Sequence, residues 1–278
     1  MTDSVLRAIA DDGSFRVIAA HTTQTVREVL ATQKATGSSA RHLGDLVTGA
    51  ILVRETMAPD LRVQGILKGV EGSGMLVADA HPDGSTRGLV TSRALGGVVV
   101  AHGAVLQMMR TMPGGSIHQG IVEAPSGGVS GALMAYMQDS EQVESSVAVS
   151  SLFEGTDLSS AGGYLVQLLP EAERGSLETM TERLTKMPLL DDLLAAGHAS
   201  PEELLTAIFG DLPFTVLATS PLRFGCQCSK ERLLAALSTI DHNEIKSMVV
   251  EGKPIEITCD YCAKNYSISP AELDSLLN

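Results

Sequence analysis

Four cysteines are the residues whose types and spacing point most directly to chemistry. Cys226, Cys228, Cys259 and Cys262 form two close pairs, and the first 225 residues contain no cysteine. In a reducing cytosol this pattern indicates metal ligands or redox thiols and not structural disulfides. Two pairs separated by 30 residues match the needs of a tetrahedral Cys₄ zinc site, because each pair supplies two sulfurs from one turn. We therefore predict that these four cysteines bind one zinc ion.

The first pair is unusual because only one residue separates its cysteines, whereas zinc ribbons ordinarily use Cys-x-x-Cys. Ligands this close in the chain become strained disulfide partners once a metal leaves, and strained disulfides are labile and regulatory. Zinc also holds thiols as thiolates, the form that oxidants attack. The four residues can therefore serve as a structural clamp and as an oxidant sensor. His242 is a weak candidate for a fifth ligand, although four thiolates already complete a tetrahedron.

The chain is acidic, with 20 Lys and Arg against 33 Asp and Glu and a formal net charge of −13. This balance argues against a nucleic-acid partner, because phosphate binding requires clustered basic residues. Apolar runs such as 96–101 are too short to cross a membrane. The N-terminus lacks a basic start followed by an apolar stretch, so we expect no signal peptide and a cytoplasmic location.

The elements that must position the cysteines fall into three predicted stretches. Residues 1–170 mix grouped strands with a few helices, which is typical of a large α+β domain. Residues 171–220 form a helical linker of short segments that depend on tertiary packing for stability. This linker is a candidate for conditional folding or, equally well on composition, an ordinary helical connector. Residues 221–278 form a small zinc domain, in which a metal makes up for a marginal hydrophobic core.

The predicted strands share short β-branched or apolar runs between turn residues. They are 15–20, 61–67, 75–80, 86–90, 98–101, 104–109, 118–123, 147–152 and 164–169. Helical spacing predicts an amphipathic helix over 39–55 and another around 129–137. The predicted elements of the last two stretches are a helix over 171–186, a short apolar turn or two over 189–196, helix starts at Ser200, Asp241 and Ser269, and a hairpin of 255–258 with 266–268.

No enzyme motif accompanies these elements. The sequence contains neither a phosphate-binding loop nor a dinucleotide-binding glycine fingerprint, and its histidines form no metal-binding pair. Ser130 has the wrong glycine spacing for a nucleophile elbow. Because nothing assembles a nucleophile, a base and an oxyanion hole, we expect no catalytic turnover.

The whole chain resembles the redox-regulated holdase chaperones of the 33-kilodalton heat-shock protein family. The resemblance is carried by Phe-Gly-Cys-Gln-Cys-Ser at 224–229 and by Cys-Asp-Tyr-Cys-Ala-Lys-Asn-Tyr at 259–266. It extends through 11–16, 87–88, 119–123, 139–143 and 161–170. Ala263 stands where the family usually has Gly, and 96–115 matches only loosely.

The resemblance implies that the reduced protein carries zinc on the four cysteines and is inactive. Oxidation would form the disulfides Cys226–Cys228 and Cys259–Cys262, release the zinc, and unfold the zinc domain with the adjoining linker. The oxidised protein would dimerise and hold unfolding client proteins without ATP.

Two other functions compete with this one. Most Cys₄ sites are structural, so the last stretch is alternatively a constitutive zinc ribbon that docks a partner protein without a redox switch. A weaker alternative is a thiol–disulfide oxidoreductase that uses Cys259 and Cys262. The surrounding sequence lacks the strand–helix alternation of a thioredoxin-like fold, which argues against that alternative.

Overall fold

The computed structural model describes residues 2–92, 96–112, 115–170, 172 and 175–277. Its contacts divide the chain into two compact units, Met1–Gly225 (unit 1) and Cys226–Asn278 (unit 2). Both units combine strands with helices, which confirms the predicted α+β class. The finer division at residues 170 and 220 stays a prediction. In the described part of the chain, no helix is both long and apolar enough to span a bilayer.

Unit 1 contains two sheets. Sheet A is antiparallel, with the strand order β10-β1-β2-β9-β8. Its strands are β1 (Ser4–Ala10), β2 (Phe15–His21), β8 (Ser145–Glu154), β9 (Asp157–Leu168) and β10 (Phe214–Pro221). Sheet B has the order β11-β5-β4-β3-β6-β7, and only the short β11 runs parallel to its neighbour. Its strands are β3 (Val63–Lys68), β4 (Gly74–Ala80), β5 (Ser85–Ser92), β6 (Val105–Thr111), β7 (Ile117–Glu123) and β11 (Arg223–Phe224).

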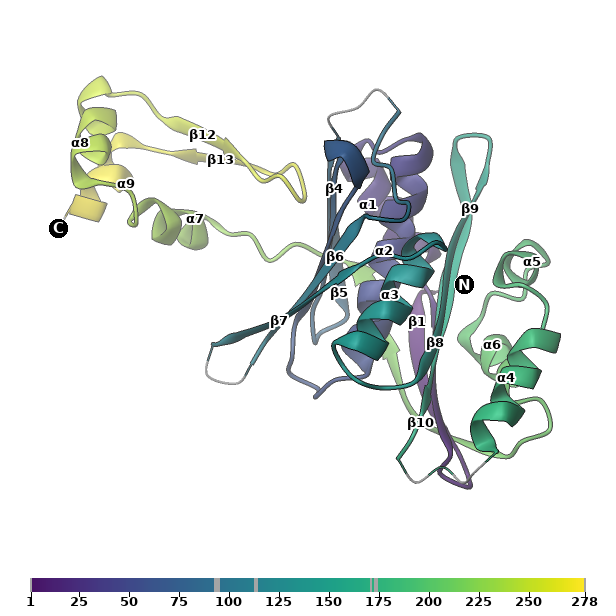
Figure 1. The fold of residues 1–278 in the computed structure, drawn as a ribbon. Helices are drawn as coiled ribbons and strands as arrows, with labels where there is room; N and C mark the ends of the chain where they lie inside the picture. The colour runs from purple at the N-terminus through teal and green to yellow at the C-terminus, as the bar shows by residue number, and fades with distance from the viewer. Residues whose placement is uncertain (1, 93–95, 113–114, 171, 173–174, 278) are drawn as a thin grey trace. The chain divides into compact units, whose positions relative to one another are not determined.

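Three helices, α1 (Thr23–Gln33), α2 (Gly37–Glu55) and α3 (Gly128–Asp139), lie between the two sheets and share one core with them (Figure 1). The sequence predicts α2 as an amphipathic helix, but it is buried on nearly every side. Even Arg54 and Glu55 are buried, and they pair with each other at 2.7 Å. The reason is that α2 contacts both sheets, so the face expected to meet water is covered.

The other face of sheet A is covered by α4 (Ser176–Lys186), α5 (Leu190–Ala195) and α6 (Pro201–Phe209), which form a second core with it (Figure 1). These are the helices predicted between residues 171 and 220. The sequence predicts that the first of these helices starts at residue 171. Residues 171, 173 and 174 lie outside the described residues. The predicted capping box is present, because Ser200 Oγ accepts a hydrogen bond from the Glu203 backbone N–H at 3.2 Å.

The structure corrects the sequence prediction at several places. Residues 98–101, predicted as a strand, have no regular secondary structure. Their backbone instead bonds to side chains, since the N–H of Val98 donates to Ser39 Oγ and that of Val99 to Ser73 Oγ. The stretch predicted to be a helical linker ends in a strand, β10, which pairs with β1. The sequence did not predict seven of the elements. They are β1, α1, β10, β11, the single turn η1 (Val70–Gly72), α7 (Lys230–Leu237) and η2 (Ser275–Leu277).

Unit 2 contains the hairpin of β12 (Ile255–Thr258) and β13 (Asn265–Ile268), as predicted. Its helices are α7 (Lys230–Leu237), α8 (His242–Glu251), α9 (Pro270–Asp274) and the 3₁₀ turn η2 (Ser275–Leu277). The predicted helix starts are confirmed, because the side chains of Asp241 and Ser269 cap α8 and α9. The buried apolar cluster is small and consists of Ile245, Ile268 and Leu273, with partly buried neighbours.

Candidate metal centre

The first cysteine pair lies in the segment directly before α7. Ser229 caps that helix, since its Oγ accepts a hydrogen bond from the Arg232 backbone N–H at 3.3 Å. The Arg232 guanidinium reaches back and donates to the carbonyl of Gln227 at 2.8 Å. Because Gln227 separates Cys226 from Cys228, this contact holds the backbone between the two thiols.

The second pair lies in the turn between β12 and β13. The backbone N–H of Cys259 donates to the carbonyl of Lys264 at 2.9 Å, and that of Ala263 donates to the carbonyl of Cys259 at 2.8 Å. These bonds close a tight loop around Cys262. The loop requires Ala263 to adopt a left-handed backbone conformation, with φ of 56°.

Replacing Ala263 with glycine is therefore expected to stabilise unit 2. A left-handed conformation costs an L-residue roughly 1–2 kcal/mol, and glycine adopts it without that strain. Part of this gain is offset by the greater entropy that glycine loses on folding, so we expect about 1 kcal/mol for Ala263→Gly. Hydrogen exchange of the unit 2 amides measures the change. Ala271→Gly, in helix α9, is the matched control and should destabilise. A loss of protection in Ala263→Gly would contradict the strain argument.

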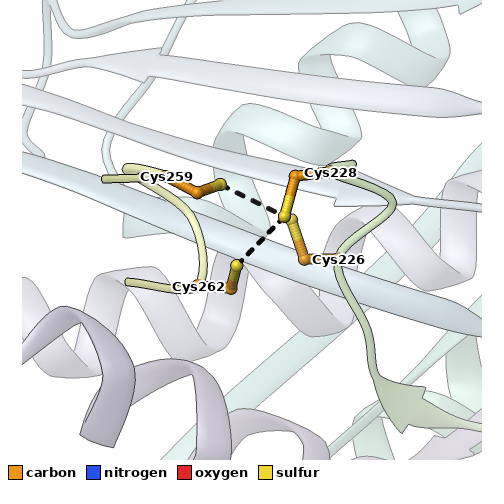
Figure 2. A group of neighbouring side chains, drawn as sticks. All are labelled: Cys226, Cys228, Cys259 and Cys262. Carbon is orange, nitrogen blue, oxygen red and sulfur yellow. Dashed lines mark hydrogen bonds between the residues drawn. The ribbon is translucent and has the colours of Figure 1, made fainter. Parts of the chain in front are cut away.

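The four cysteine sulfurs converge from these two segments, and all lie within 4.8 Å of one another (Figure 2). Two contacts cross between the pairs, with 3.8 Å from Cys226 Sγ to Cys259 Sγ and 3.3 Å from Cys228 Sγ to Cys262 Sγ. A tetrahedral zinc site with Zn–S bonds of about 2.3 Å places its sulfurs about 3.8 Å apart. The cluster therefore could form a zinc site. His242 is exposed and is not part of it.

The ionisation of the thiols also fits a cation. Burial alone would raise the pKa of Cys228, but hydrogen bonds from Tyr266 and the other thiols lower that pKa to about 7. Burial, together with the neighbouring Cys228, raises the pKa of Cys262 to about 12. Burial also raises the pKa of Cys259. One thiolate thus forms readily near neutral pH and makes the next ones costly, so four thiolates require a bound cation.

Tyr266 is a functional residue for which sequence reasoning assigned no role. It is buried on β13, and its hydroxyl lies 3.0 Å from the carbonyl oxygen and 3.1 Å from the Sγ of Cys228. The ammonium of Lys264 lies 5.0 Å from the centre of its ring. The sequence does contain a pattern that indicates a buried, hydrogen-bonded tyrosine at this position. Tyr266 and Ile268 share one face of a predicted strand, and a buried tyrosine hydroxyl needs a polar partner.

Removing this hydroxyl is expected to weaken metal binding. Groups that hydrogen-bond to metal ligands typically contribute 10–100-fold to metal affinity. We expect Tyr266→Phe to bind zinc about 10-fold more weakly, because Cys228 loses its hydrogen-bond donor while the ring still fills its place. Competition with a chromophoric chelator measures the affinity. Ser267→Ala, an exposed change on the same strand, is the control. Equal affinity in all three proteins would show that the hydrogen bond does not support the site.

The fold and the thiol cluster define an α+β protein that carries a four-cysteine centre in a separate C-terminal unit. Comparisons with known proteins identify its family. The family described as Hsp33 protein matches residues 3–269. The "33 kDa chaperonin" of Listeria welshimeri is 31% identical, covering 99% of this chain and 98% of the relative. That of Latilactobacillus sakei is 30% identical over 100% of this chain and 99% of its own.

The chain therefore belongs to the Hsp33 protein family, as its sequence predicts. A solved structure has the same fold. The crystal structure of the 33 kDa chaperonin from Thermotoga maritima superposes with a TM-score of 0.85 at 24% identity, covering 100% of this chain and 98% of that one. Family membership supports a chaperone function.

Proposed function

We propose that this protein is a redox-regulated holdase, a chaperone that binds unfolding proteins without ATP. In its reduced state it is inactive, and Cys226, Cys228, Cys259 and Cys262 hold one zinc ion. Bound zinc would keep the sulfurs as thiolates and cross-link the two segments that carry them. The observation that carries this proposal is the convergence of four thiols within 4.8 Å, in a unit whose own apolar core is small.

Oxidation converts this cluster into two disulfides. In each, two thiolates give two electrons to peroxide, whose O–O bond breaks as it is reduced to water, and the metal loses its ligands. The proposed pairs are Cys226–Cys228 and Cys259–Cys262. The family resemblance supports this pairing, and the cluster also has sulfur contacts across the two segments, which would allow the crossed arrangement. Peptide mapping of the oxidised chain distinguishes the two arrangements.

Loss of the zinc then unfolds unit 2 and loosens the helices α4–α6. This exposes apolar surface to which unfolded or oxidatively damaged client proteins bind. The oxidised protein is a homodimer, acts in the cytoplasm, and uses neither nucleic acid nor a membrane as its partner. The apolar face that α4–α6 cover on sheet A supports this proposal, because that cluster contains more buried residues than the cluster of unit 2.

The experiment that tests the proposal is light scattering from a heat-unfolded client. The full chain is added either reduced and zinc-loaded or after peroxide treatment, and a third sample is oxidised, reduced again and reloaded with zinc. Suppression of aggregation only in the oxidised sample is expected. Equal scattering in all three would make the cluster a constitutive zinc ribbon, and insulin reduction by the chain would favour an oxidoreductase. Sedimentation of the same samples tests the dimer.

A further inference from the structure

A cavity of about 310 Å³ lies in unit 1 and combines thioethers with guanidinium groups. Its walls include Met57, Met112 and Met137 together with Arg16 and Arg110. Met57 follows α2, Arg110 is on β6 and Met137 is on α3, so the cavity forms where distant parts of the chain meet. Thioethers are weak hydrogen-bond acceptors, so a cationic donor that faces one gains only a weak hydrogen bond.

Arg110 supplies a guanidinium group that donates to one of these thioethers. Its Nη1 donates to Glu141 Oε2 at 3.0 Å and, in a weak hydrogen bond, to the sulfur of Met57 at 3.8 Å. Its Nε is buried and has no hydrogen-bond partner among the described residues. A thioether accepts a hydrogen bond only weakly, so a stronger acceptor in the place of the Met57 sulfur would strengthen the bond that it receives from the Arg110 guanidinium. The strongest acceptor that Met57 can offer is its own sulfoxide oxygen.

We propose that Met57 is an oxidation site whose sulfoxide is bound by Arg110. Hydrogen peroxide transfers one oxygen atom to the sulfur. The O–O bond breaks, an S–O bond forms, the sulfur loses two electrons and the peroxide leaves as water. The new oxygen then accepts a charge-assisted hydrogen bond from the guanidinium. Oxidation of a core methionine ordinarily disrupts packing. Here the cavity has room for one oxygen and a donor is already in place.

Two other methionines show why Met57 differs. Met134 on α3 is 37% exposed, so its sulfoxide would meet only water. Met137 on the same helix also lines the cavity but is only 1% exposed and belongs to the main core, and no hydrogen bond to its sulfur is seen among the described residues. Met57 is partly buried at the cavity and has a cationic partner. Unit 1 thus has a response to oxidants that involves none of the four thiols and does not depend on the proposed function.

The test uses the full chain, treated with peroxide, then reduced with dithiothreitol and reloaded with zinc. Dithiothreitol restores the thiols, whereas methionine sulfoxides need dedicated reductases and stay. Peptide mass spectrometry should find the sulfoxide at Met57 and not at Met137. The melting temperature should stay unchanged in the native chain but fall by about 2–4 °C in Arg110→Lys, which keeps a positive charge toward Glu141 and lacks the guanidinium that also donates to Met57. Met57→Leu, treated in the same way, measures how much of the change in melting temperature comes from the oxidation of other methionines.

A second pair of variants avoids dependence on the Arg110 substitution. The side-chain carbonyl of Met57→Gln places a strong acceptor near the position of the sulfoxide oxygen, and Met57→Leu places none. We expect Met57→Gln to melt at or above the temperature of Met57→Leu when Arg110 is native. A thioether at Met57 that survives peroxide overturns the proposal. An equal fall in melting temperature after peroxide in the native chain and in Arg110→Lys would also overturn it. A Met57→Gln chain that melts below Met57→Leu would do the same.

Discussion

Stripping the metal from the zinc-loaded chain is expected to unfold unit 2 and to leave the core of unit 1 around α1–α3 folded. The physical reason is the size of the unit 2 core, whose apolar cluster has Ile245, Ile268 and Leu273 as its buried residues. Structural zinc contributes on the order of 10–16 kcal/mol in small zinc-binding peptides. Whole domains are stable by only about 5–15 kcal/mol. Because so few side chains are buried, we expect the folded state of unit 2 to be unstable once the metal no longer cross-links its two segments.

Hydrogen exchange with mass spectrometry resolves this prediction by element. After chelation, amides of α8 and of the hairpin β12–β13 should exchange at the rate of an unfolded chain, whereas those of α2 stay protected. Cys262→Ser, which removes one thiolate at nearly the same size, should behave like the chelated protein. Ser247→Ala, an exposed change on α8, should bind zinc and stay protected. Protection of α8 in the chelated chain would mean that the apolar cluster suffices without metal.

Replacing Phe209 with alanine is expected to make the reduced, zinc-loaded protein bind unfolding clients. Phe209 is fully buried at the end of α6 and stacks on Phe214 with ring centres 4.4 Å apart. Removing a buried phenylalanine side chain costs roughly 3–5 kcal/mol. The neighbouring helix gives little support, because Met180 is the only buried residue of α4. The layer α4–α6 should therefore open locally and uncover the apolar face of sheet A.

Light scattering of a heat-unfolded client, without oxidant, measures this effect in the Phe209→Ala chain. Hydrogen exchange on the same sample should show loss of protection confined to α4–α6, with α2 unchanged. Leu189→Ala is the matched control, because Leu189 is 73% exposed and its loss opens nothing. A Phe209→Ala protein that opens at α4–α6 but fails to suppress aggregation would place client binding on another surface.

Several features follow from short stretches of sequence. Paired cysteines four or fewer positions apart, the caps at Ser200, Asp241 and Ser269, and the hairpin around Cys259 all depend on neighbours within a few residues. Spacing and side-chain chemistry specify such features directly. For the same reason, residue type and spacing alone predict which four cysteines form the candidate site.

Contacts between residues that are distant in the chain cannot be predicted from such local patterns. The amphipathic pattern of residues 39–55 cannot show that a second sheet covers the polar side of α2. The apolar run 98–101 resembles a strand, yet Ser39 and Ser73 take its hydrogen bonds. Strand β10 pairs with β1 across more than half of the chain, and no local pattern encodes that register.

By itself, the sequence determined the four thiols, the α+β class, the family, and most helices and strands, because these depend on residue type and local spacing. Only the tertiary structure decided which groups surround them. It placed the hydroxyl of Tyr266 on Cys228, α4–α6 on sheet A, and Arg110 beside Met57. Each of these contacts joins segments that are far apart in the chain. They form only when the whole chain packs, because the free energy that selects them comes from burial shared among many residues.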